Sequence, residues 1–249
     1  MEYAEKHNIP IEQSKNKIYS RDRNLWHISH EGADLEDPAN EPKDDLFVIS
    51  NPVSKTPNKP DYVSIDFEQG IPVKLNGKKI GGVTLIEELN KIGGKHGVGQ
   101  VDLVENRLVG IKSRGVYETP GGAILMFAHA ALESLTLDRD TAHYKQQVAL
   151  KYAELVYNGL WFTQLREALD AFVNATQRNV TGQVKVKLSK GKCSLAGMTS
   201  PYSLYRTDLA SFVMGAEYDP TDATGFIRLF GLQAKVAGIV NKQKNKEKR

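Results

Sequence analysis

Apolar and polar side chains alternate in two stretches of the chain, and this period of two predicts antiparallel hairpins. In residues 62–75 the alternation continues on both sides of Gln69-Gly70, a pair suited to a tight turn, and Asn76-Gly77 marks the next turn. In residues 180–199 it continues on both sides of Lys190-Gly191-Lys192. Each hairpin is therefore predicted to turn one apolar face inward.

Helical periodicity occupies much of the remaining chain. Thr84 is expected to cap a helix that ends at Gly93-Gly94, and Thr119-Pro120 is expected to begin another. Further helices are predicted over residues 2–8, 141–157, 165–177, 203–212 and 222–241. The last of these carries a broad apolar face, which would either cap the core of this chain or pack against another subunit.

Residues 20–60 show neither period. They are polar and rich in Pro, Asn and Asp, which predicts a long ordered loop with Asp34–Pro42 as its most exposed portion. Hairpins and helices are mixed without a regular strand–helix–strand alternation. The fold class is therefore predicted to be α+β, with mixed helices, antiparallel hairpins and a long C-terminal helix.

Polar side chains concentrate in Glu105–Gly122, between an expected strand at Val98–Val104 and an expected helix. The strand-like pattern reaches Lys112, with Gly110 as a break. Charged, hydroxyl and aromatic groups lie between glycines in this segment, whereas a segment that served packing alone would be plainly apolar. The pattern predicts a binding site for a polar ligand on a connection between regular elements.

Composition restricts the class of protein without naming it. A chain of 249 residues can bury a sizeable core, and a net charge of +3, concentrated in the tail Lys242–Arg249, is too small to indicate nucleic acid. Cys193 is the only cysteine, so no intrachain disulfide can form and a reducing cytoplasm is expected. No apolar run approaches the ~20 residues that span a bilayer, so no membrane partner is expected.

Two long segments give the chain a recognisable signature. The first reads Tyr-Ser-Arg-Asp-Arg-Asn-Leu-Trp-His-Ile-Ser-His-Glu-Gly from Tyr19, and the second reads Lys-His-Gly-Val-Gly-Gln-Val-Asp-Leu-Val-Glu-Asn-Arg from Lys95 and continues to Gly122. Further matches follow at residues 157–162, 180–184, 200–205 and 222–227. With these segments in order, the chain resembles argininosuccinate synthase over essentially its whole length.

The resemblance implies an enzyme of arginine biosynthesis that joins citrulline to aspartate at the expense of ATP, releasing AMP and pyrophosphate. Family members have a nucleotide-binding domain, then a synthetase domain, then a C-terminal helix used in homotetramer assembly. Residues 1–19 are accordingly expected to be the end of the first domain, and residues 20–221 the synthetase (citrulline-binding) domain. Residues 222–249 are expected to form the oligomerisation helix and a basic tail.

The family's phosphate-binding loop, a Ser-Gly-Gly-Leu-Asp-Thr-Ser type segment, has no counterpart in this chain. Met1 corresponds to an interior position of family members, so the chain is expected to be a fragment. Attack on the α-phosphate of ATP needs backbone donors and Mg²⁺, and the missing domain would bind both ATP and Mg²⁺. The chain alone is therefore expected to be inactive. The competing hypothesis is a non-catalytic oligomerisation or regulatory module derived from the enzyme.

By resemblance, the citrulline contacts fall on Ser20, Ser29, Glu105 and Tyr117, and no catalytic residue, cofactor contact or metal ligand is assigned in this chain. A bound amino acid needs an anion for its ammonium group, which Glu105 can supply. It also needs hydrogen-bond partners for its carboxylate or ureido group, which the three hydroxyls can supply.

Each of these four residues also has a purely structural interpretation. The two serines could be turn or capping hydroxyls. Glu105 could form a surface ion pair with Arg107 or Lys112, the commoner role of such a carboxylate. Tyr117 could lie at the edge of the core with its hydroxyl in water.

Other polar residues are expected to have structural roles. His27 and His30 lack a third ligand in suitable spacing for a metal, and Cys193 lies in a hairpin without a His partner. The run Lys112–Arg114 is expected to fix its loop, or to close it against the missing domain or a neighbouring subunit. Gln100 stands where family members commonly carry Arg, which is expected to weaken a salt bridge near the site.

Overall fold

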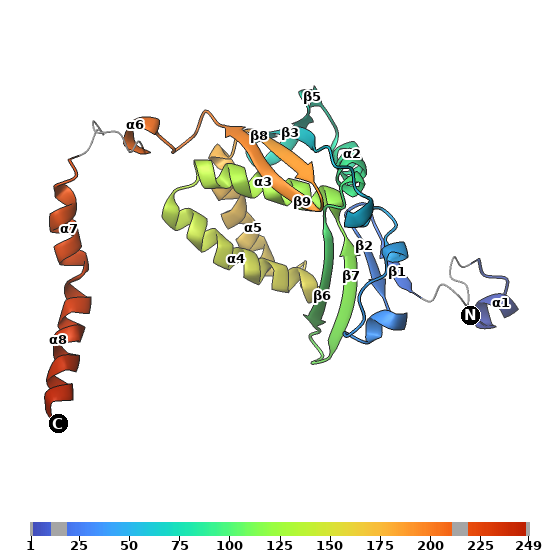
Figure 1. Ribbon diagram of the computed structural model, residues 1–249, viewed down its shortest axis with the longest axis horizontal. Coiled ribbons are helices and arrows are strands. Elements are labelled where there is room, and N and C mark those ends of the chain that lie inside the picture. The colour runs from blue at the N-terminus through green and yellow to red at the C-terminus, as the bar shows by residue number, and fades with distance from the viewer. Residues whose placement is uncertain (1, 11–18, 211–218, 248–249) are drawn as a thin grey trace. The chain divides into compact units, whose positions relative to one another are not determined.

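The computed structural model describes residues 2–10, 19–210 and 219–247. The chain divides into two compact units, Met1–Leu204 and Tyr205–Arg249. The first unit combines helices with two antiparallel sheets, as Figure 1 shows. The α+β class predicted from the sequence is therefore confirmed.

A five-stranded sheet forms one layer of the first unit, in the order β5-β4-β3-β8-β9. Its strands are β3 (Asp61–Glu68), β4 (Ile71–Leu75), β5 (Lys78–Lys79), β8 (Gly182–Ser189) and β9 (Lys192–Thr199). The turns at Gln69-Gly70, Asn76-Gly77 and Lys190-Gly191 have positive φ at both residues, which is the geometry that matches the twist of a hairpin. Both hairpins predicted from alternation are confirmed.

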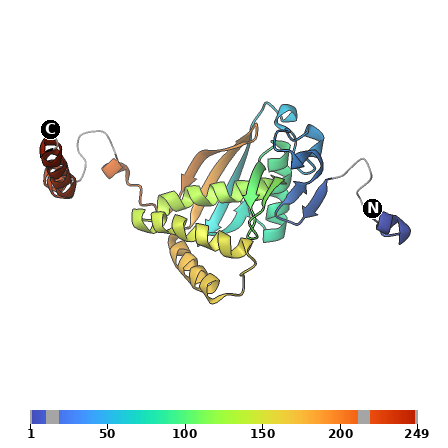
Figure 2. The same ribbon diagram turned by 90° about the horizontal axis from the view of Figure 1, so that it is seen from below.

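Helices α2 (Gly82–Lys95) and α3 (Pro120–Thr136) pack on this sheet, with α3 lying across the strands (Figure 2). Their interface is a cluster of buried apolar side chains that includes Ile65 and Val186 from the sheet and Ile124 from α3. Full burial of such a side chain stabilises the fold by about 1.5–3 kcal/mol relative to exposure. Packing of α3 in this core therefore fixes the position of its first turn and the position of the polar segment that precedes it.

Helix α2 starts two residues earlier than predicted, whereas α3 starts as predicted but without a side-chain capping bond. Helix α2 begins at Gly82 with Gly81 as its cap, two residues before Thr84, and Gly93-Gly94 lie in its last turn. Pro120 is the first residue of α3 as predicted, and Thr119 occupies the N-cap position. The Thr119 hydroxyl makes no capping bond, however, because it donates to the backbone carbonyl of Trp26 at 3.1 Å.

The second sheet of the first unit has four strands, in the order β1-β2-β7-β6. Its strands are β1 (Ser20–Arg23), β2 (Ile28–Glu31), β6 (Gln100–Asn106) and β7 (Lys112–Glu118). Two predictions are wrong here. Residues 20–60 contain β1, β2 and three short 3₁₀ helices rather than a long loop, and the supposed connection Glu105–Gly122 contains strand β7.

The physical reason for these errors is that both faces of this sheet carry polar side chains. One face bears serine, glutamate and tyrosine, while the other buries a polar network, so the strands lack the apolar–polar alternation that indicates a half-buried sheet. The 3₁₀ helices span Ala33–Glu36, Asp44–Leu46 and Val53–Lys55. They bury Leu35 and Leu46 against Val116, so the segment Asp34–Pro42 is not exposed throughout.

Helices α4 (Arg139–Tyr157) and α5 (Gln164–Thr176) complete the first unit, and both were predicted. The carboxylate of Asp138 caps α4 by accepting from the backbone N–H groups of Asp140 and Thr141. The predicted helix near the N-terminus is also present as α1 (Glu2–Lys6).

The second unit contains α6 (Thr207–Ala210), α7 (Asp222–Phe230) and α8 (Leu232–Glu247). Helix α6 covers part of the helix predicted over 203–212, whose last two residues lie outside the described part. The single helix predicted over 222–241 is two helices, bent by 46° at Gly231, because glycine tolerates a kink that other residues resist. None of the described helices is by itself long and apolar enough to cross a membrane; only α7 and α8 together reach that length and composition.

Candidate functional site

The register of the four-stranded sheet brings the four predicted ligand residues onto one face. Ser29 on β2 lies directly opposite Tyr117 on β7, and Ser20 on β1 lies opposite position 31, two residues after Ser29. Glu105 on β6 lies opposite position 113, four residues before Tyr117. Paired residues share a face and facing alternates along a strand, so all four side chains project to the same side.

Glu105 and Tyr117 are in direct contact, and a second tyrosine joins them. The Tyr117 hydroxyl donates to Oε1 of Glu105, and the hydroxyl of Tyr157, the last residue of α4, donates to Oε2 at 2.7 Å. These hydrogen bonds, first from Tyr117 and then from Tyr157, lower the pKa of Glu105 below its ordinary value. The carboxylate is therefore ionised at neutral pH.

Tyr117 remains a neutral donor in this arrangement. Its burial, and then its hydrogen bond to Glu105, raise the pKa of the phenol above its ordinary value. Its ring lies along the strand over Gly115, where an added Cβ would come within 2.6 Å of the hydroxyl oxygen. A side chain at position 115 would therefore displace the ring. This explains why the Ser-Arg-Gly-Val-Tyr-Glu motif has glycine at that position.

A hollow of about 520 Å³ opens beside this cluster. It is lined by Trp26, His27, Val101, Leu103, Glu105, Tyr117, Thr119 and Tyr157. Apolar side chains form most of the lining, and Glu105 supplies its only carboxylate. An apolar surface with a few placed polar groups is typical of small-molecule sites, and an ionised carboxylate at one position suits a ligand with an ammonium group.

The two serines lie outside the lining of this hollow. Ser20 is exposed on the edge strand β1. Ser29 is 5% exposed, and its hydroxyl oxygen accepts from the backbone N–H of Asp22 at 3.3 Å, a contact within its own hairpin. The structure thus brings Glu105 and Tyr117 together and places Ser29 next to Tyr117, while Ser20 lies at the sheet edge.

The surface ion pair considered for Glu105 is not formed. Among the described residues, Arg107 pairs with Glu31 at 3.7 Å and Lys112 donates to the side-chain oxygen of Asn106 at 2.6 Å. Sequence reasoning missed Glu31 and Tyr157 as neighbours of the site. The alternation of β2 would have revealed Glu31 next to Ser29, but no local signal places Tyr157 beside Glu105.

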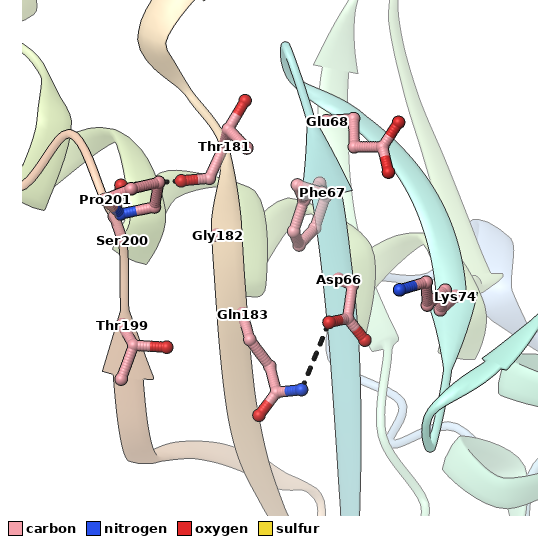
Figure 3. Close-up of a pocket in the computed structure, with 10 residues that line it drawn as sticks. All are labelled: Asp66, Phe67, Glu68, Lys74, Thr181, Gly182, Gln183, Thr199, Ser200 and Pro201. Carbon is pink, nitrogen blue, oxygen red and sulfur yellow. Dashed lines mark hydrogen bonds between the residues drawn. The ribbon is translucent and has the colours of Figure 1, made fainter.

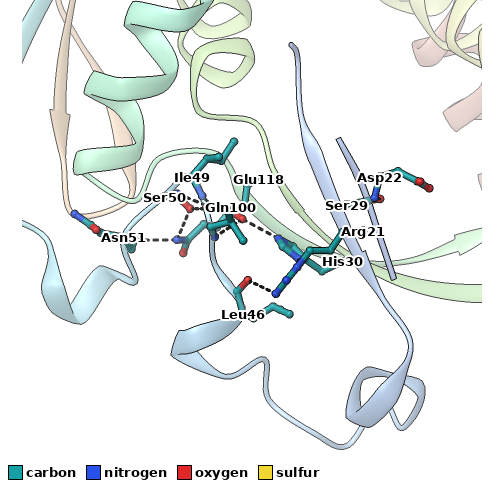
Figure 4. A network of polar contacts seen from close by, with 11 residues as sticks. Arg21, Asp22, Ser29, His30, Leu46, Ile49, Ser50, Asn51, Gln100 and Glu118 are labelled. Atoms are coloured by element: carbon teal, nitrogen blue, oxygen red, sulfur yellow. Dashed lines mark hydrogen bonds and ion pairs between the residues drawn. The ribbon is translucent and has the colours of Figure 1, made fainter. Parts of the chain in front are cut away.

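The opposite face of the sheet carries a buried network centred on Glu118 (Figure 4). Arg21 donates to Nδ1 of His30 at 3.0 Å, so the ring proton is on Nε2, which donates to Glu118 at 2.7 Å. His30 is therefore a structural residue rather than a metal ligand. His30 and Glu118 directly follow Ser29 and Tyr117 in their strands, so the network lies immediately behind the candidate site.

Glu118 also holds the chain segment 48–50. Its two oxygens accept from the backbone N–H groups of Val48, Ile49 and Ser50 at 2.8, 3.0 and 2.7 Å, and from the Ser50 hydroxyl at 2.6 Å. Burial alone raises the pKa of Glu118, but the donors prevail and the net pKa lies below the ordinary value. Gln100 joins this network through Ser50 and the Asn51 carbonyl, both at 2.9 Å.

Two further predictions concern residues outside the hollow. Arg114 donates to both carboxylate oxygens of Asp102 and to the backbone carbonyls of Leu35, Asp37 and Asn40, so it fixes the 35–40 segment against β7. Burial raises the pKa of Cys193 to about 11. Its thiol therefore stays protonated at neutral pH, as expected for an inert cysteine.

Another hollow, of about 430 Å³, is lined by residues from β3, β4, β8 and β9 and from the segments next to β8 and β9, and Figure 3 shows these side chains. Asp66 accepts there from the Gln183 amide at 3.2 Å, and Glu68 and Lys74 also line the hollow. It contains none of the predicted ligand residues. In the described part of the chain, no group of three or more His, Cys, Asp or Glu side chains could hold a metal ion.

The sequence of this chain is similar to those of known proteins. The sequence profile described as arginosuccinate synthase C-terminal domain matches residues 19–237. Argininosuccinate synthase of Desulfitobacterium hafniense is 60% identical over 243 residues, and that of Carboxydothermus hydrogenoformans is 61% identical over 242. These alignments cover 98% and 97% of this chain but 61% and 60% of the relatives. The chain therefore spans about three fifths of the length of the curated relatives it matches.

Proposed function

The chain belongs to the argininosuccinate synthase family, and from this premise we propose that it supplies the citrulline-binding and assembly part of a ligase that joins citrulline to aspartate in arginine biosynthesis. The observation that carries the proposal is Glu105, an ionised carboxylate held by two phenol hydroxyls beside a largely apolar hollow. That combination fits a small amino acid with an ammonium group and an aliphatic stem.

In this proposal the carboxylate of Glu105 accepts hydrogen bonds from the α-ammonium group of citrulline. The apolar side chains of Trp26 and Leu103 contact the methylene groups of the ligand. Ser29 and Ser20 extend the same face of the sheet toward β1, where their hydroxyls serve the remaining polar groups of the ligand. The ammonium contact contributes most of the affinity, because hydrogen bonds between charged partners are the strong ones.

ATP and Mg²⁺ are assigned to the part of the family's enzyme outside this chain. The chain covers 61% of the length of the Desulfitobacterium hafniense relative, and the sequence has no counterpart of the family's phosphate-binding loop. The contribution of this chain is to bind and orient citrulline, while activation of the ureido group by ATP, and its capture by aspartate, take place with the rest of the enzyme.

Assembly into a homotetramer is the second part of the proposal. Helices α7 and α8 expose large apolar side chains, including Phe226 at 63% and Phe230 at 79%. A face of this kind is unfavourable in water and is typical of a subunit interface. A second copy of the chain is the proposed occupant, because homo-oligomers bury such faces by symmetry.

Citrulline binding to the purified chain tests the site. By calorimetry, replacement of Glu105 by Gln is expected to weaken citrulline binding by about tenfold or more, because a charge-assisted hydrogen bond contributes about 1.5–3 kcal/mol. Glu88→Gln serves as the matched control, because Glu88 is exposed on α2 and does not line the hollow. Equal affinities of wild type and Glu105→Gln, or no citrulline binding by the wild type, would contradict the proposal.

A further inference from the structure

Tyr157 connects helix α4 to the candidate site. Its hydroxyl donates to Oε2 of Glu105 at 2.7 Å across 52 residues of sequence. In the described part of the chain it makes the only hydrogen bond or ion pair found between α4 and the four-stranded sheet. The side chain is 52% exposed, so apolar burial does not explain why it lies there.

The end of α4 is built so that Tyr157 has a defined position. Gly159 has φ +71° and donates to the carbonyl of Val156 at 3.1 Å, and Leu160 donates to the carbonyl of Leu155 at 2.8 Å. These two bonds form a Schellman motif, the helix ending that requires a residue in the left-handed region and therefore favours glycine. Leu155 is buried and anchors the last turn, which places the Tyr157 hydroxyl.

The two oxygens of Glu105 are each held by a different phenol. Oε1 accepts from Tyr117 and Oε2 from Tyr157. A carboxylate has about four lone-pair sites, so roughly half of its capacity remains for a ligand. A glutamate side chain that is already fixed does not lose its rotamer freedom when a ligand binds, a loss of up to about 1.5–2 kcal/mol.

We propose that Tyr157 is a positioning residue for Glu105: its hydroxyl holds the carboxylate in the orientation that receives the ligand. The proposal rests on the proposed function only in naming citrulline as that ligand. The other groups that act on Glu105 are Tyr117, by its hydrogen bond, and the positive charge of Arg107, which is itself paired with Glu31 at 3.7 Å. Tyr157 alone among these comes from outside the β6–β7 hairpin.

Tyr157→Phe removes the hydroxyl and keeps the ring, so it isolates this contact. Two measurements are made on the purified chain: the pKa of Glu105 by carboxyl NMR, and citrulline affinity by calorimetry. The pKa of Glu105 is expected to rise because a donor to its ionised form is lost. Citrulline binding is expected to weaken by about five- to tenfold, with Glu105 still present but free to adopt other rotamers.

Two control variants on the same helix separate positioning from stability. Tyr144→Phe alters an exposed tyrosine that does not contact Glu105, and neither measurement should change. Tyr152→Phe removes a hydrogen bond of 2.7 Å to Asp170 on α5. It should lower thermal stability while leaving the pKa of Glu105 in place, which is the result that a merely structural role of Tyr157 would give.

The outcomes distinguish this inference from the proposed function. If the pKa of Glu105 stays the same in Tyr157→Phe, positioning by Tyr157 is wrong, whether or not citrulline binds. If the pKa rises and citrulline affinity falls, both proposals are supported. If the pKa rises but the wild-type chain binds no citrulline, the proposed ligand is wrong and the positioning contact stands.

Discussion

Neighbouring residues in strands β2 and β7 serve opposite faces of one sheet. Ser29 and Tyr117 project toward the candidate site, and the residues after them, His30 and Glu118, project into a buried network on the other face. The polar network behind the sheet therefore determines the position of the strands that carry the ligand residues. A change at Glu118 should act on the fold, whereas a change at Glu105 should act on binding.

Glu118→Gln is expected to lower the free energy of unfolding by about 3–5 kcal/mol at neutral pH. The amide nitrogen of glutamine is a donor, and it would face backbone N–H groups of Val48–Ser50 that need an acceptor. Urea unfolding at pH 7 measures the change, with Glu88→Gln as an exposed control. An unfolding midpoint equal to that of the wild type would rule out this role for Glu118.

The same substitution should change how stability depends on pH. The folded-state pKa of Glu118 lies below its ordinary value of 4.5, so ionised Glu118 stabilises the fold above that pH, and this stability is lost as pH falls from about 4.5 through the folded-state pKa. The difference in unfolding free energy between wild type and Glu118→Gln should therefore become smaller as the pH falls below about 5. Unfolding curves at a series of pH values would show a constant difference if Glu118 were not the group responsible.

The helices differ in how far the described residues bury their apolar side chains. Helix α3 is largely surrounded by its own core, whereas α7 and α8 expose apolar side chains at helical spacing. Phe226 and Phe230 stack at 5.2 Å between ring centroids, one turn apart, and so form a continuous apolar ridge. This ridge is the feature of α7 that the proposed tetramer would bury.

Phe230→Asp is expected to shift the chain from an oligomer toward the monomer mass of 27.7 kDa. A charge in an apolar interface loses its hydration without gaining a partner, so association should weaken by more than about tenfold. Light scattering after size-exclusion chromatography measures the mass. Gln233→Asp adds the same charge at a polar position of α8 and should leave the mass unchanged; an identical shift in both variants, or in neither, would contradict the assignment.

The molecule as a whole spans about three fifths of the length of its relatives, and the proposed reaction extends beyond it. The charge that develops on a phosphate under attack is stabilised by backbone donors and Mg²⁺, which are assigned to the remaining part of the relatives. The described residues supply a carboxylate, phenols and an apolar hollow, to which the proposal assigns the binding of the amino acid.

The purified chain is therefore expected to make no argininosuccinate from citrulline, aspartate and Mg-ATP. Product formation can be followed by mass spectrometry, with the full-length protein of Carboxydothermus hydrogenoformans as the positive control under the same conditions. Turnover by the chain alone would show that the assignment of ATP to the rest of the enzyme is wrong.

The local sequence pattern was sufficient to predict those parts of the fold in which one face is apolar and the other is exposed to solvent. The hairpins of the five-stranded sheet, helices α4 and α5 and the start of α3 at Pro120 followed from periodicity and turn or cap residues, within a few positions. Strands β1, β2 and β7 did not, because each carries polar groups on both faces. The long motifs identified the family, since they hold residue identities that periodicity does not use.

The sequence by itself thus determined the family, the fold class and two side chains of the hollow, Glu105 and Tyr117. Only the tertiary structure decided that Tyr157 completes the cluster, that Ser20 and Ser29 lie outside the hollow, and that Glu118 binds a segment 68 to 70 residues away. The physical reason is that a hydrogen bond between distant residues leaves no period and no spacing in the chain. It exists because sheet pairing and helix packing place a donor within reach of an acceptor.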